Sequence, residues 1–202
     1  QALGYATHWT DLDSRDYGLP QDRRRLFIVA IQTTALKHPF KWPVRLQPPP
    51  SVDVLLDAIH STDTAGRLPR NKRKRDVCLD TYKECYTSHR CDPRITPILV
   101  DVGASPKLKS FGIDEAKTIT RTRGGDGGPW ISTRGRHTSS DELMRLQGFI
   151  FDDVPWATAG LSKRQFGQLL GNSMSVNTIG CVLEEALFSS GLVKQRVAFP
   201  RG

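Results

Sequence analysis

An uninterrupted apolar run from Leu26 to Ile31 is the feature that most constrains the fold of this 202-residue chain. Its length and composition are typical of a β-strand that is buried on both faces. Strands of this kind lie in sheets that are covered by helices. The run therefore predicts an α/β fold, and we assign residues 1–32 to the end of its core.

Residues 136–202 carry the start and stop signals of three successive helices. Ser139 with Glu142, and Ser162 with Gln165, have the spacing of capping boxes. The helices are expected to end near Gly148, Gly171 and Gly191. The predicted apolar face of the first helix is Leu143, Leu146 and Ile150, and that of the second is Phe166, Leu169 and Leu170. The third helix is expected between Ser175 and Ser190, and its apolar face is Val176, Ile179, Leu183, Ala186 and Leu187.

The middle of the chain, residues 33–135, is irregular in sequence. The prolines at 48–50, the basic run Arg70 to Arg75 and the glycine-rich stretch from Arg121 to Pro129 interrupt any long periodic pattern. We therefore expect loops with short strands. The exceptions are one short helix at 52–60 and one strand at 95–102.

The chain is basic, with 29 Lys and Arg against 21 Asp and Glu and a net charge of +8. Such a balance favours capture of a polyanion, and nucleic acid is the natural candidate. No window offers the roughly 18 consecutive apolar residues that a membrane span needs. These features predict a soluble protein.

The four cysteines are too few and too unevenly spaced for a disulfide framework, which indicates reduced thiols inside a cell. Cys78, Cys85, His89 and Cys91 form a cluster in sequence. They lack the paired CxxC spacing of zinc sites, so we expect no metal there.

Two basic segments have more than one interpretation. The run Arg70 to Arg75 is compatible with a solvated loop, a phosphate-contacting patch or a nuclear-import signal. Arg121 and Arg123 stand beside four glycines, which suits a flexible loop that reads a DNA groove, or equally a disordered tip.

Three motifs carry potential chemistry. Arg23 and Arg25 alternate along an entering strand, so two guanidinium groups would face one side and suit a phosphate or a carbonyl oxygen. The turn at 171–176 precedes a helix, where free N–H groups favour an anion beside Asn172 and Ser173. Taken singly, these motifs fit a solvated strand end and ordinary helix capping just as well.

In this order, the motifs resemble the last conserved blocks of the DNA cytosine-5 methyltransferase family. The block Tyr-Gly-x-Pro-Gln-x-Arg-x-Arg is matched at Tyr17, Gly18, Pro20, Gln21, Arg23 and Arg25. The next block is matched at Arg136, Glu142, Arg145, Leu146, Gln147, Gly148 and Phe149, with Thr138 and Ser139 departing from it. The closing block is matched at Gly171, Asn172, Ser173 and Val176, with Met174 in place of valine.

The resemblance implies transfer of a methyl group from S-adenosyl-L-methionine to carbon-5 of cytosine in double-stranded DNA. In this family a cysteine thiolate adds to carbon-6 of a cytosine that has been flipped out of the duplex. The implied fold is part of a Rossmann-like methyltransferase core, with a small irregular target-recognition domain at 33–135 and a helical return to the core at 136–202.

The resemblance also implies roles in DNA binding. Arg25, and with it Arg23, would hold the flipped base and its backbone, where charge-assisted donors stabilise developing negative charge. Gln21 would help to order these arginines, and Thr118 would touch a phosphate of the target strand. Arg121 and Arg123 would belong to the DNA-reading loop.

On the cofactor side, Asn172 and Ser173 would face S-adenosyl-L-methionine. Arg136 and Glu142 would brace the recognition segment against the core. These two roles are likewise carried over from the family's blocks.

The family's glycine-rich cofactor loop and its Pro-Cys nucleophile do not occur in this chain, in which no cysteine follows a proline. We therefore expect the chain alone to be inactive, as a piece of a longer enzyme or as one subunit of a split enzyme. The alternative is a non-catalytic DNA-binding or regulatory relative. In either case an intracellular location is expected, nuclear if the source is eukaryotic.

Overall fold

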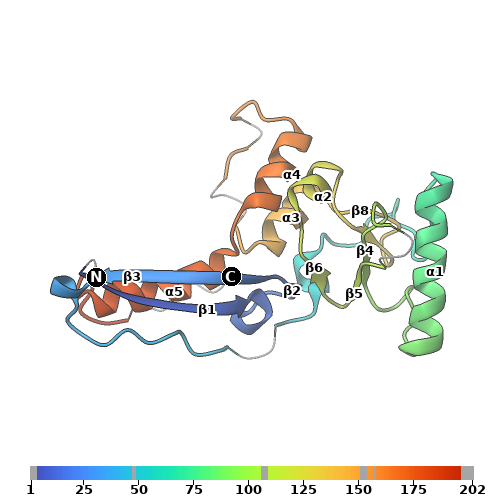
Figure 1. Ribbon diagram of the computed structural model, residues 1–202. Helices are drawn as coiled ribbons and strands as arrows, with labels where there is room; N and C mark the ends of the chain where they lie inside the picture. Colours follow the sequence, from blue (N-terminus) through green and yellow to red (C-terminus); the bar gives the residue numbers. More distant parts are fainter. Residues whose placement is uncertain (1–3, 47–48, 106–108, 151–153, 157, 197–202) are drawn as a thin grey trace.

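A computed structural model describes residues 4–46, 49–105, 109–150, 154–156 and 158–196 of the chain. These residues form a mixed α/β structure with β1, β3 and α5 at one end, α1 at the other end, and α2, α3 and α4 between them (Figure 1). The elements are β1 (Tyr5–Asp13), η1 (Ser14–Tyr17), β2 (Gln21–Asp22), β3 (Arg24–Gln32), η2 (Thr33–Ala35), η3 (Val52–Leu55), α1 (Lys72–Ser88), β4 (Ile98–Val100), β5 (Phe111–Ile113), β6 (Ala116–Lys117), α2 (Arg121–Gly125), β7 (Trp130–Ile131), β8 (Arg136–His137), α3 (Ser140–Leu146), α4 (Lys163–Asn172) and α5 (Val176–Ser189).

The expected strand at 26–31 is confirmed as part of β3, but its burial on both faces is wrong for this chain. β3 pairs antiparallel with β1 in a two-stranded sheet, and Phe27 packs in a core with Cys181 and Val182 of α5. On the other face Ile28 is 66% exposed, and its cross-strand partner Trp9 is 72% exposed. The apolar run is continuous, yet only one of its two faces is covered.

A four-stranded antiparallel sheet in the order β5-β4-β7-β8 forms the middle of the molecule. Its strand β4 confirms the strand predicted at 95–102, although β4 is shorter. Ile98 and Val100 pack against α1, whereas Leu99 points to the opposite face and joins a core with residues of α3 and α4. Alternation along one short strand therefore connects two separate hydrophobic cores.

The helix α1 was not predicted, because residues 33–135 were expected to contain only loops, short strands and one helix at 52–60. The buried face of α1 consists of Cys78, Thr81, Tyr82 and Cys85, which recur at helical spacing. All four side chains carry a polar or weakly polar group, so the face lacks the Leu and Ile pattern that normally marks an amphipathic helix. The remaining surface of α1 is mostly charged.

The predicted helix at 52–60 is wrong. The structure has only the 3-10 turn η3 there, capped by Ser51. Buried Val52 and Leu56 nevertheless join the central core, so this segment is anchored by packing without continuous helical hydrogen bonding.

The three C-terminal helices are confirmed with both predicted capping boxes. Gly148 and Gly191 have the positive φ angles expected at helix ends. Two details were wrong: α4 continues through Gly171 to Asn172, and Ile150 lies beyond the end of α3. None of the described helices combines the length and the apolarity needed to cross a membrane.

Helices α2 and α4 approach each other so closely that only glycine fits at the contact. A Cβ atom added to Gly167 would lie 2.1 Å from the backbone oxygen of Gly124, and one added to Gly124 would lie 2.0 Å from the oxygen of Gly167. Gly171 similarly faces the backbone of Thr120. The contact fixes the start of the glycine-rich loop against α4.

We predict that Gly167→Ala lowers the free energy of unfolding by about 1–3 kcal/mol, because the new methyl group forces two backbones apart. Arg164→Ala, on the exposed first turn of the same helix, is the matched control and should change stability by less than about 0.5 kcal/mol. Urea unfolding of both variants tests this, and equal stability of the two would contradict the close approach.

Candidate active site

Arg23 lies at the junction of three segments that are far apart in sequence. Its guanidinium donates hydrogen bonds to the backbone oxygens of Ile119 at 2.8 Å, Gly171 at 3.3 Å and Ser173 at 2.5 Å. Burial, and to a smaller extent the charge of Arg25, lowers the pKa of Arg23 to about 10, so the group is still cationic at neutral pH. Arg23 thereby joins the first and third sequence motifs to the segment that precedes α2.

The two arginines of the first motif do not face the same side, contrary to the prediction from strand alternation. Arg23 occupies the break between β2 and β3 and is buried, whereas Arg25 lies within β3 and is exposed. Arg25 donates only to the neighbouring carbonyl of Arg24, at 2.7 Å. Its guanidinium is therefore the one that is accessible to a ligand.

Gln21 lies on β2, and Thr118 directly follows β6, the strand that pairs with β2. Gln21 is fully buried, and both polar atoms of its side chain lack a hydrogen-bond partner within the described structure. Thr118 donates its hydroxyl to the carbonyl of Asp22 at 2.8 Å. Contact of these residues with DNA and the ordering of the arginines by Gln21 both stay predictions.

The second motif joins the third through Gln147. The Gln147 side chain donates to the carbonyl of Leu170 at 3.2 Å, and the backbone N–H of Val176 donates to the carbonyl of Gln147 at 2.9 Å. Three motifs that are separated in sequence therefore converge on one buried polar junction.

Arg136 and Glu142 form a two-pronged ion pair with both N–O distances at 2.9 Å. Glu142 is fully buried and also accepts hydrogen bonds from the backbone N–H groups of Asp57 and Ser139. Hydrogen bonding to Glu142 is the main reason that the pKa of Arg136 is raised. Both residues lie within residues 136–202, and the pair is tied to residues 33–135 through Asp57 and Asp63; the bracing role stays a prediction.

Asp57 extends this bracing, because it pairs with Arg145 of α3 at 2.5 Å and accepts a hydrogen bond from Ser139 at 3.0 Å. Burial opposes ionisation of Asp57, but the hydrogen bonds outweigh it and lower the pKa of the carboxyl group. The segment around Asp57 is thus held to α3 by charge as well as by packing.

At the junction of α4 and α5, Asn172 and Ser173 are adjacent but differ in their hydrogen bonding. Asn172 is exposed, and its amide has no hydrogen-bond partner among the described residues. Ser173 donates its hydroxyl to the carbonyl of Leu170 at 2.8 Å. Contact of Asn172 and Ser173 with a cofactor stays a prediction.

Arg121 and Arg123 are not equivalent. Arg123 pairs with Asp101 at 2.9 Å and donates to the carbonyl of Gly103, so its charge is neutralised within the chain. Arg121 is exposed at the start of α2 and has no ion pair with any described acidic residue. Arg121 is therefore the residue of the two that is available to a ligand.

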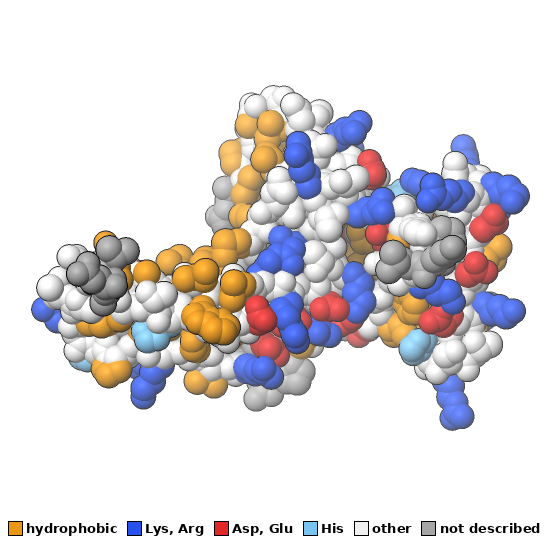
Figure 2. Space-filling model, in the orientation of Figure 1, with side chains coloured by type: hydrophobic (Ala, Val, Ile, Leu, Met, Phe, Trp, Pro, Cys, Tyr) orange, Lys and Arg blue, Asp and Glu red, His pale blue; other side chains and the backbone are white. Residues whose placement is uncertain are grey.

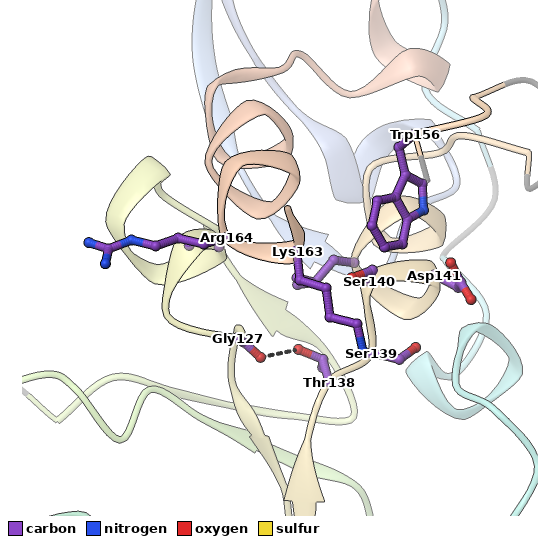
Figure 3. Close-up of a pocket in the computed structure, with 11 residues that line it drawn as sticks. Gly127, Thr138, Ser139, Ser140, Asp141, Trp156, Lys163 and Arg164 are labelled. Carbon is purple, nitrogen blue, oxygen red and sulfur yellow. Dashed lines mark hydrogen bonds between the residues drawn. The ribbon is translucent and has the colours of Figure 1, made fainter. Parts of the chain in front are cut away.

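Beside the glycine-rich loop lies a pocket of about 240 Å³ with both polar and apolar side chains in its lining, which was not predicted from the sequence. Lys163 reaches from α4 toward Thr138 and Ser139, whereas Arg164 points away from them (Figure 3). Thr138 donates to the carbonyl of Gly127 at 3.1 Å, which shapes the wall of the pocket. The sequence signal for this pocket was the Lys163-Arg164 pair directly after the capping Ser162. The sequence there was interpreted only as the start of a helix.

The chain belongs to the C-5 cytosine-specific DNA methylase family, whose sequence profile matches residues 1–187. It is similar to the Type II methyltransferase M.BsuFI of Bacillus subtilis, with 25% identity over 201 residues, 98% of this chain and 42% of the relative. The chain therefore spans less than half the length of this curated relative.

Two solved structures have a similar fold. The Entamoeba histolytica methyltransferase EhMeth is 16% identical, with a TM-score of 0.54, and the match covers 92% of this chain and 54% of that protein. The S. pombe Dnmt2 methyltransferase is 13% identical, with a TM-score of 0.55, covering 92% and 59% respectively. At these identities the likeness shows a methyltransferase fold and no more.

We predict that Arg23→Met lowers the free energy of unfolding by about 3–5 kcal/mol, because three carbonyl groups lose a charged donor. Arg25→Met is the matched control, since Arg25 makes only one exposed hydrogen bond, and it should change stability by less than about 0.5 kcal/mol. Urea unfolding under identical conditions measures both, and similar losses would contradict the assignment of Arg23 as the buried junction.

Proposed function

We propose that this chain is the C-terminal portion of a DNA (cytosine-5-)-methyltransferase, which transfers a methyl group from S-adenosyl-L-methionine to carbon-5 of cytosine in double-stranded DNA. The supporting observation is the buried junction at which Arg23 joins the first motif to the third, and to which Gln147 links the second motif. In this proposal the matched sequence blocks are the family's functional blocks, and the chain is part of a Rossmann-like core with a recognition domain inserted into it.

The exposed Arg25 is the residue that we assign to the flipped cytosine. Its guanidinium would donate to the ring carbonyl, where negative charge develops after nucleophilic addition. Arg23 holds the surrounding backbone in place, which is a positioning role. Arg121 would contact the DNA backbone near the glycine-rich loop.

S-adenosyl-L-methionine supplies the methyl group when bound. We place Asn172 and Ser173 on its side of the site, because the free Asn172 amide is a donor and acceptor without a partner in the described chain. The other walls of the cofactor site would come from the portion of the enzyme that the family places before these blocks.

The nucleophile would also come from that portion. Cys78 and Cys85 lie in the core under α1, and burial raises the pKa of Cys78 to about 12 and of Cys85 to about 11. Buried thiols that remain protonated are poor nucleophiles. We infer that this chain is inactive alone.

An exposed apolar face supports a docking site for the remaining portion, in the same chain or as a separate subunit. Trp9, Leu26 and Ile28 are exposed on the sheet face that points away from α5, and Leu183 and Leu187 are exposed on α5 itself. Hydrophobic side chains gather visibly over this end of the molecule (Figure 2). Exposed apolar patches on this scale mark interaction sites.

The experiment that tests the function is transfer of labelled methyl from S-adenosyl-L-methionine to duplex DNA. This chain alone is compared with the chain joined to its N-terminal portion. Transfer only by the joined protein supports the proposal. Retained DNA binding without transfer would instead establish the alternative, a non-catalytic DNA-binding or regulatory relative.

We predict that Arg25→Ala in the joined enzyme lowers kcat by about 100-fold while thermal stability is unchanged, because it removes a charged donor from the developing charge. Arg24→Ala, the neighbouring exposed arginine, is the control and should leave kcat nearly unchanged. Near-normal turnover of Arg25→Ala would remove Arg25 from the site.

Asn172→Ala is predicted to weaken binding of S-adenosyl-L-methionine by about 10-fold, through loss of one or two hydrogen bonds, with little effect on DNA affinity. Calorimetric titration of the joined enzyme with cofactor and with DNA measures both. An unchanged cofactor affinity would contradict the role given to Asn172.

A further inference from the structure

A basic cleft between the start of α1 and the end of the four-stranded sheet lies outside the proposed active site. Its volume is about 430 Å³, and its lining includes Arg67, Arg70, Lys74 and Arg136 above the rings of Trp130 and His137. No acidic side chain of the described structure lines it. Lys and Arg side chains gather around the end of the molecule where α1 begins (Figure 2).

The walls of the cleft are fixed by the protein itself. Trp130 donates its indole N–H to the carbonyl of Arg67 at 3.2 Å and meets His137 edge to face at 5.3 Å. Gly135 has a φ angle of +63°, and a Cβ atom there would lie 2.4 Å from the backbone of Thr64. The Arg67 segment is thereby held against the sheet, so the cleft is preformed.

Three of the four cations in the cleft are electrostatically free. Arg136 is neutralised by Glu142 and Asp63. Arg67, Arg70 and Lys74, by contrast, form no ion pair with any acidic residue in the described ranges. Their mutual repulsion is unfavourable unless an anion enters the cleft.

The orientation of Lys74 supports a binding role. Lys74 lies four residues before the buried Cys78, so it continues the inward face of α1 and is half-buried. The first turn of α1 contains Lys72, Arg73 and Lys74 and no acidic residue, although the positive end of a helix dipole favours acidic groups there. An anion in the cleft would relieve both sources of repulsion.

We propose that this cleft binds a backbone phosphate of the DNA duplex and extends the DNA contact of the protein beyond the target cytosine. The inference rests on the proposed function, because it takes DNA as the substrate. Arg67 and Arg70 supply guanidinium donors, which match phosphate oxygens in geometry, and Lys74 supplies a third positive charge. Such contacts position the duplex without reading its sequence.

The same basic run was compatible with a nuclear-import signal. In the structure, Asn71 caps α1 and residues 72–75 form its first turn, with Lys74 turned toward the sheet. A receptor that reads a linear basic segment would have to unwind this turn. The folded geometry therefore favours DNA.

The test compares Arg70→Gln/Lys74→Gln with Lys41→Gln/Lys83→Gln in the joined enzyme. The control pair removes the same charge from exposed positions, and Lys83 is on the opposite face of α1 from Lys74. DNA affinity is measured by fluorescence anisotropy across a range of salt concentrations. We expect about a 10-fold to 30-fold weaker affinity at 0.15 M salt for the cleft variant, with a salt slope smaller by about one to two.

Methyl transfer at saturating DNA should be unchanged in the cleft variant. An unaltered salt slope, or equal changes in the control pair, would overturn the proposal, and loss of nuclear accumulation with normal DNA binding would assign the run to import instead. If the joined enzyme transfers no methyl group but the cleft variant still has the smaller salt slope, the proposed function is refuted and the cleft proposal stands. An active enzyme with no slope change would refute the cleft alone.

Discussion

The hydrogen bonds of the buried Arg23 guanidinium hold together the parts of this chain on which any function depends. A charged group inside a protein is costly unless it is hydrogen-bonded, and here the terminal nitrogens of Arg23 donate to carbonyl groups of two distant segments, while its Nε has no partner among the described residues. Because those segments are separated by about 100 and 150 residues from Arg23, one side chain fixes the relative position of β3, the segment before α2 and the α4–α5 turn. The exposed Arg25 and Asn172 lie on two of these segments, β3 and the α4–α5 turn.

A second set of charges attaches the segment around Asp57 to β8 and α3. Glu142 has no exposure, and its carboxylate accepts from Arg136 and from two backbone N–H groups, which compensates its burial. Arg145 and Asp57 add a neighbouring pair. The glycine contact between α2 and α4 adds a further restraint, because it holds the start of the glycine-rich loop against α4.

Local signals explain which parts of the structure could be predicted from the sequence. The capping serines and following glycines identified α3 and α4, because capping depends on residues only a few positions apart, whereas α5 was identified from its apolar spacing and Gly191. The helix α1 was missed because its buried face is built from Cys, Thr and Tyr. The burial of Arg23 and the exposure of Arg25 could not be predicted either. They depend on a break between β2 and β3 and on carbonyl groups distant in sequence.

The two-sided burial of β4 limits which parts of residues 33–135 could be replaced without loss of the fold. Leu99 shares a core with helices of the C-terminal part, while its neighbours Ile98 and Val100 face α1. A graft that replaced all of residues 33–135 would therefore cut through a shared hydrophobic core. A chimera that folds would have to retain the side chains of β4 and β7 that face α3 and α4. Only α1 and the outer loops could then be exchanged.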